Sequence, residues 1–188
     1  MTKSMARICY AIAMLFLTSI CLADTATDKP SAMLKTISYR GGIVTFSVPK
    51  AWKEEYEPVG GGTFYDNRPD SGTLRLNVLS FDSQETPAPQ MALKAFPEGS
   101  FEILGSGLPF RQSMVQVTEN QELLHIHKWD IAVPVQPRSL RLVLFSYTIL
   151  ASQETEAKTK AELALINESI RTAIFSRVAG VAGIYHQD

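Results

Sequence analysis

The sequence feature that most restricts the fold is the segment from Ser139 to Leu150. Its side chains alternate with a period of two, as in a β-strand, but both faces of this strand are apolar. One face carries Leu140, Leu142 and Leu144, and the other carries Val143, Phe145, Tyr147 and Ile149. A strand that is apolar on both faces needs cover on both sides. The sequence therefore predicts a sheet with this strand at its centre.

Other parts of the chain carry shorter strand patterns. Residues 43–48 place Val44, Phe46 and Val48 on one face, which is typical of a half-buried strand. Further strands are expected at residues 36–39, 63–65, 73–81, 112–119 and 121–133, and residues 134–137 are expected to break the last of them. The charged stretch 53–57 is expected to form a solvated loop.

Two helices complete the expected set of elements. A short helix is expected at residues 91–96 and a long one at 154–175, although Thr159 and Glu162 have capping-box spacing and offer an alternative start. The long helix has an apolar stripe made of Leu163, Ile166, Ile170, Ala173 and Ile174. The order of elements predicts the α+β class, with helices covering a mainly antiparallel sheet.

The first 23 residues have the three parts of a secretory signal peptide. Lys3 and Arg7 make a short positive segment, residues 8–22 are nearly all apolar, and small residues precede a cleavage point after Ala23. As a helix the apolar segment spans about 22 Å, which is less than the about 30 Å of a membrane core. A signal peptide is therefore preferred to a membrane anchor, and a lipoprotein attached through Cys21 is the alternative.

Cleavage would divide and change the chain. It would leave a flexible leader (24–35), one domain (36–176) and a flexible C-terminal tail (177–188), without a transmembrane span. Both cysteines would leave with the signal peptide, so disulfides and thiol chemistry are not expected. The formal charge would change from −1 to −3, which argues against nucleic acid or anionic lipid as a partner.

Several motifs resemble the PsbP-like superfamily, which includes PsbP of photosystem II and bacterial envelope proteins of the DcrB type. Residues 46–52, Phe-Ser-Val-Pro-Lys-Ala-Trp, resemble the strand and Pro-x-x-Trp motif that begin this domain. Segments 63–66 and 71–76, the late apolar strand and the closing helix follow in the same order, so the resemblance covers about residues 36–175. It implies an α/β/α sandwich around an antiparallel sheet. It also implies a binding or accessory role, because the family shares no catalytic residues.

His125 and His127 form the sharpest chemical feature of the sequence. Residues at positions i and i+2 of a strand point to the same side, about 6–7 Å apart. Two imidazoles at that spacing are within reach of one Zn or Cu ion, but the sequence shows no third ligand. A neighbouring strand or His186 would have to supply it. The pair is therefore interpreted as half-exposed strand histidines, with a metal site as the alternative.

Trp52 and Trp129 are the candidate structural or surface tryptophans. Pro49 ends a strand because it lacks an N–H, and Trp52 can then fold back as a plug over the end of the sheet. A ring that stacks on a ligand is the alternative interpretation of Trp52.

The sequence thus predicts an exported envelope protein, periplasmic or secreted, that acts by binding another envelope protein. No motif pairs a nucleophile with a base, and no cofactor is expected. The alternatives are a periplasmic metal-binding protein that uses His125 and His127, and an enzyme with an unrecognised site. A broad apolar surface favours a protein partner, whereas a cleft with titratable groups of perturbed pKa favours an enzyme.

Overall fold

The computed structural model describes residues 33–58, 60–135 and 137–178. The predicted signal peptide, residues 24–32 of the predicted leader and residues 179–188 of the predicted tail lie outside the described residues. None of the described helices is long and apolar enough to cross a membrane.

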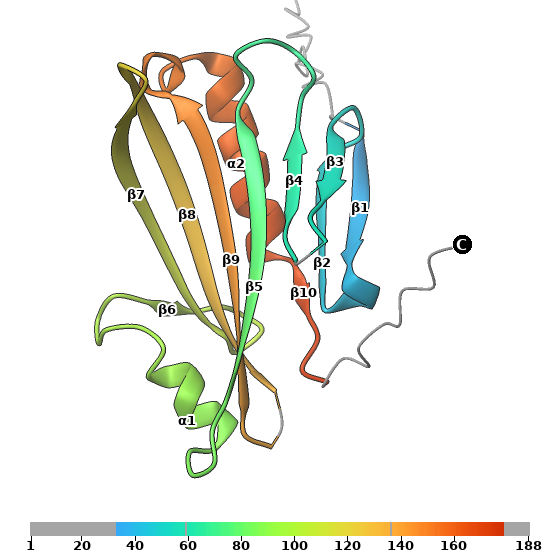
Figure 1. Ribbon diagram of the computed structural model, residues 1–188, viewed down its shortest axis with the longest axis vertical. Helices are drawn as coiled ribbons and strands as arrows, with labels where there is room; N and C mark the ends of the chain where they lie inside the picture. The colour runs from blue at the N-terminus through green and yellow to red at the C-terminus, as the bar shows by residue number, and fades with distance from the viewer. Residues whose placement is uncertain (1–32, 59, 136, 179–188) are drawn as a thin grey trace, which may run out of the picture. The chain divides into compact units, whose positions relative to one another are not determined.

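The described part of the chain forms two antiparallel sheets and two helices (Figure 1). The large sheet has the strand order β3-β4-β5-β9-β8-β7-β6, and the small sheet has the order β1-β2-β10. The strands are β1 (Leu34–Tyr39), β2 (Val44–Pro49), β3 (Lys53–Tyr56), β4 (Gly62–Tyr65), β5 (Thr73–Asp82), β6 (Glu102–Ile103), β7 (Pro109–Glu119), β8 (Glu122–Val135), β9 (Ser139–Leu150) and β10 (Ile174–Phe175). The helices are α1 (Ala88–Leu93) and α2 (Ala157–Arg171), and two short 3-10 turns are η1 (Arg40–Gly42) and η2 (Ala151–Gln153).

The strand that is apolar on both faces lies where the sequence predicts. It is β9, with the predicted bounds, and it is the fourth of the seven strands of the large sheet, between β5 and β8. This position lets β9 form long antiparallel ladders on both edges. The central role of this strand is confirmed.

The main core lies on one face of the large sheet, which we name the inner face. Phe145 and Tyr147 of β9 point into it and are fully buried. Phe46 of the small sheet packs edge-on against Phe145, with ring centroids 5.1 Å apart. Ile166 and Ile170 of α2 are buried in the same cluster. Helix α2 and the small sheet together therefore cover the inner face.

Hydrogen bonds of Ser169 fasten α2 to the small sheet. The Ser47 N–H donates to Ser169 Oγ at 2.8 Å, and this hydroxyl donates to the Ser47 carbonyl at 2.6 Å. Strand β10 pairs with β2 only at Val44 and Thr45. The Ser169 hydroxyl therefore supplies the hydrogen-bond partner for the N–H and C=O of Ser47, further along the same edge of β2.

The described residues cover the opposite, outer face of the large sheet only in part. Helix α1 packs there: its Ala92, together with Phe96 just after the helix, lies in a second, smaller apolar cluster with Ala132 and Leu140. The fold is α+β with a mostly antiparallel sheet and a C-terminal helix, as predicted. The second helical layer is, however, a single helix of six residues.

The bounds of both helices differ from the prediction. Helix α1 starts at Ala88 because Pro89 fits the first turn, where an N–H has no acceptor within the helix. Helix α2 starts at Ala157, and its N-cap residue makes no side-chain capping bond. The predicted capping box is wrong because Glu162 instead accepts a hydrogen bond from the buried Tyr147 hydroxyl, at 2.8 Å. Ile174 is wrongly placed in the helical stripe, since it lies in β10 and is 67% exposed.

Three strands also correct the expected pattern. The charged stretch predicted as a loop forms β3, whose side chains are exposed at an edge of the large sheet. Strand β1 begins at Leu34, two residues before the predicted strand and within the predicted leader. Strand β8 continues through Pro134, which pairs with β9 beyond the last β7 partner, Ile131. The missing N–H of this proline therefore costs no bond to β7.

Candidate functional site

The two predicted histidines lie side by side on the inner face of β8. His125 is opposite Ile149 and His127 is opposite Tyr147 in the ladder with β9. Their side chains are 13% and 14% exposed, so they are more buried than the half-exposed pair that the sequence predicts. The expected orientation to one side is confirmed.

Glu154 joins the two imidazoles. It follows directly after η2, which turns the chain back over the end of β9. Its Oε2 contacts His125 Nδ1, and its Oε1 lies 3.4 Å from His127 Nε2. The hydrogen bond with His125 lowers the pKa of the Glu154 carboxyl, burial opposes this shift, and the charge of His127 adds to it. The sequence alone did not point to this carboxylate, because 27 residues separate it from His127.

Both ring nitrogens of His125 contact protein side chains. The Gln116 amide lies 3.0 Å from His125 Nε2, and Glu154 contacts Nδ1 on the other side of the ring. A proton on Nδ1 would be donated to the carboxylate, and Nε2 would accept from the amide. Both nitrogens of His125 are thus engaged by protein groups. Within the described ranges, no set of three or more His, Cys, Asp or Glu side chains is arranged to hold a metal ion.

Both candidate tryptophans belong to the core. Trp52 is 4% exposed and stacks on Tyr147, with ring centroids 6.1 Å apart and planes inclined by 10°. Trp129 is fully buried, and its Nε1–H donates to Asn167 Oδ1 of α2 at 3.1 Å. Each ring is therefore held by protein groups, as the structural interpretation of Trp52 expects.

The larger candidate site is the part of the outer sheet face that α1 leaves uncovered, which we name the open sheet face. Leu79 of β5 and Val115 and Val117 of β7 are each more than 40% exposed on it. Ladder register places further half-buried apolar side chains on the same face: Leu124, Ile126, Leu144 and Leu150. The sequence predicts cover on both faces of β9, but α1 covers only part of its outer face.

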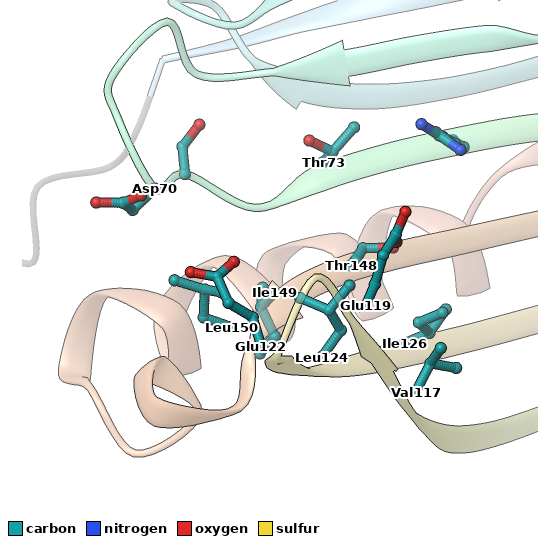
Figure 2. Close-up of a pocket in the computed structure, with 12 residues that line it drawn as sticks. Asp70, Thr73, Val117, Glu119, Glu122, Leu124, Ile126, Thr148, Ile149 and Leu150 are labelled. Carbon is teal, nitrogen blue, oxygen red and sulfur yellow. The ribbon is translucent and has the colours of Figure 1, made fainter.

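A groove of about 370 Å³ lies on this face near the β7–β8 hairpin (Figure 2). Its apolar lining includes Val117, Leu124, Ile126 and Leu150, and Figure 2 shows these side chains together beside Thr148. The remaining lining residues include three acids and one base: Asp70, Glu119, Glu122 and Arg75. The groove thus has an apolar floor and a mainly acidic rim.

A buried ion pair links the open sheet face to the part that α1 covers. Asp130 is 2% exposed, and its Oδ2 accepts hydrogen bonds from Arg111 Nε at 3.1 Å and Nη2 at 2.6 Å. The same guanidinium lies 4.9 Å from the centre of the Phe96 ring. Arg111 therefore neutralises a buried charge and holds the segment after α1 against the sheet.

Sequence reasoning missed the open sheet face, although a signal for it was present. Leu79 and Phe81 fall on the otherwise polar side of β5, opposite Leu142 and Leu140 of β9. Apolar residues on that side of two neighbouring strands indicate a second apolar face. What the sequence could not show is how little of this face the short helix covers.

Comparison with known proteins supports the fold. No model of a known protein family matches the chain, and no curated protein sequence matches it. Among solved structures, a Bacteroides thetaiotaomicron protein is 18% identical with a TM-score of 0.48, over 76% of this chain and 48% of that one. This chain therefore matches about half the length of that protein.

Two further structures match most of their own length. LpqN, described as involved in cell envelope biogenesis of Mycobacterium tuberculosis, is 16% identical with a TM-score of 0.52, over 75% of this chain and 89% of that one. The cyanobacterial PsbP of Synechocystis sp. PCC 6803 is 11% identical with a TM-score of 0.39, over 77% and 94%. The chain has a PsbP-like fold. At these identities the likeness to LpqN shows the fold alone.

Proposed function

We propose that this protein is an exported accessory protein of the bacterial cell envelope, and that it acts by binding another envelope protein without catalysis. The observation that carries the proposal is the open sheet face. Val115 and Val117 of β7 lie uncovered by the described residues, beside the half-buried Ile126 and Leu124 of the neighbouring strand β8. Leu79 of β5 is exposed on the same face of the sheet. Contiguous exposed apolar surface marks sites of interaction with other proteins.

Export is supported by two further observations. The first 23 residues have the order of charge, apolar stretch and small residues that a secretory signal peptide has. LpqN, whose structure shares this fold, is described as a protein of cell envelope biogenesis. A partner in the envelope fits both observations.

The proposal is tested by co-purification from a periplasmic extract of the native host. The tagged protein is compared with a variant that carries Leu79→Lys and Val117→Lys on the open sheet face. Ile174→Lys is the matched control, because Ile174 is an exposed apolar residue of the small sheet. We expect one specific partner with the wild-type protein and the control, and its loss with the double variant. Equal recovery with all three proteins would show that the open sheet face is not the binding surface.

Metal binding through His125 and His127 is the second candidate. The observation that favours it is the buried His127 Nε2, which has no hydrogen-bond partner among the described residues and lies 3.4 Å from Glu154 Oε1. A Zn or Cu ion would have to displace the hydrogen bonds of His125 to use both rings. Calorimetric titration with each metal tests the candidate, and His127→Gln should abolish any heat of binding. Affinity no better than millimolar for both metals would rule it out.

A further inference from the structure

The two edges of the large sheet differ in length and charge, and the proposed function does not involve this difference. Strand β3 forms one edge; it has four residues, three of them charged, and all are exposed. Charged side chains and short length are the usual means by which an edge strand is kept from pairing with another chain. The β3 edge is therefore protected.

The opposite edge is formed mainly by β7 and has no such protection. Strand β6 pairs only with Pro109 and Phe110 of β7, so the described residues provide no partner for this edge from Arg111 to Glu119. The residues between these two ends are Gln, Ser, Met, Val, Gln, Val and Thr, without a charge, a proline or a glycine. A long, uncharged edge of this kind presents a row of unpaired N–H and C=O groups to a second strand.

We infer that this β7 edge pairs with the β7 edge of a second copy of the chain, in antiparallel orientation, to form a two-fold symmetric dimer. The charges at the two ends of the β7 edge favour a second copy of the chain, in antiparallel orientation, as the partner strand. Arg111, whose Nε and Nη2 bond Asp130 of its own chain and whose side chain is 34% exposed, stands at one end and Glu119 at the other, and register places both on the outer face. Antiparallel self-pairing brings the arginine of each copy towards the glutamate of the other, whereas parallel pairing would place like charges together.

The apolar side chains of the edge fit the same arrangement. Val115 and Val117 are exposed on the outer face near the middle of the strand, and Met114 is exposed on the inner face. A two-fold axis perpendicular to the sheet keeps each face on its own side, so the valines of the two copies would meet. The open sheet faces of the two copies would then lie on the same side of one joined sheet.

Sedimentation of the purified protein over a range of concentrations tests the dimer. We expect a reversible monomer–dimer equilibrium for the wild-type protein. Val115→Lys should shift it towards monomer, because each dimer would gain two positive charges near its axis. Glu119→Lys should weaken self-association by about tenfold, because it replaces two opposite-charge pairs by like-charge pairs.

Glu122→Lys is the matched control for the second variant. Glu122 lies directly opposite Glu119 in the same hairpin, but on β8 and away from the free edge. It should leave the dimer intact. A wild-type protein that stays monomeric at every concentration would overturn the inference, and so would equal weakening by Glu119→Lys and Glu122→Lys. Because the measurement uses the isolated protein, its result is independent of any envelope partner.

Discussion

At the scale of single residues, Glu154 ties together groups from three parts of the chain. It contacts His125 and lies close to His127, while Gln116 of the neighbouring strand holds the other nitrogen of His125. The sequence predicted that the two histidines share a side, because strand geometry requires it. It could not predict Glu154, since the turn that positions this carboxylate has no recognisable pattern.

The contribution of Glu154 to stability should depend on pH. Its pKa in the folded protein is lowered below the ordinary value of 4.5. Its contribution is therefore present above pH 4.5 and is lost as the pH falls through the lowered value. We expect Glu154→Gln to show a smaller loss of unfolding free energy in acid than the wild-type protein, measured by chemical denaturation. The nearby exposed Glu156→Gln should behave like the wild-type protein, and an unchanged acid profile in Glu154→Gln would contradict this role.

Gly72 is required for close packing around Tyr147. A Cβ atom on Gly72 would lie 2.1 Å from the Tyr147 hydroxyl oxygen, which is bonded to Glu162 and cannot move freely. We expect Gly72→Ala to lower the free energy of unfolding by about 1–3 kcal/mol, the usual cost of overpacking. Gly105→Ala is the control, because a Cβ there meets no atom within 4 Å. Equal melting temperatures of the two variants would contradict the packing argument.

At the scale of secondary-structure elements, the sequence predicted the buried faces of strands better than the residues at which elements begin and end. The position of β9 followed from apolar residues on both of its faces, and Val44, Phe46 and Val48 of β2 are buried as expected. The predicted ends of α2 were wrong because the residues used to place them make tertiary contacts instead. Glu162 accepts a hydrogen bond from Tyr147, and Ile174 pairs with β2. Strand β3 was missed because an edge strand can be fully charged.

The packing of α2 can be tested with two isoleucines that look equivalent in the sequence. Ile170 is completely buried against the inner face, whereas Ile174 is exposed in β10. Ile170→Ala should lower the free energy of unfolding by about 2–5 kcal/mol, as is usual for a buried isoleucine. Ile174→Ala should change it by less than about 0.5 kcal/mol. Thermal or chemical denaturation measures both, and similar losses would place Ile174 in the core as well.

At the scale of the whole described domain, the two faces of the large sheet have different roles. The inner face holds the core, both tryptophans and the histidine pair, while the outer face is covered only where α1 packs. The sequence indicated the fold through the order of its motifs. It could not indicate the uncovered area, which depends on the length and position of one short helix.

The central claim is that the open sheet face binds another protein of the envelope. Site-specific photo-crosslinking in living cells tests it most directly, with a photoreactive residue at Arg75 or Leu79 on the outer face of β5, or at the exposed Lys160 of α2 as control. We predict that both β5 positions give an adduct with the same envelope protein and that the α2 position does not. No adduct from either β5 position, or the same adduct from all three, would contradict the claim.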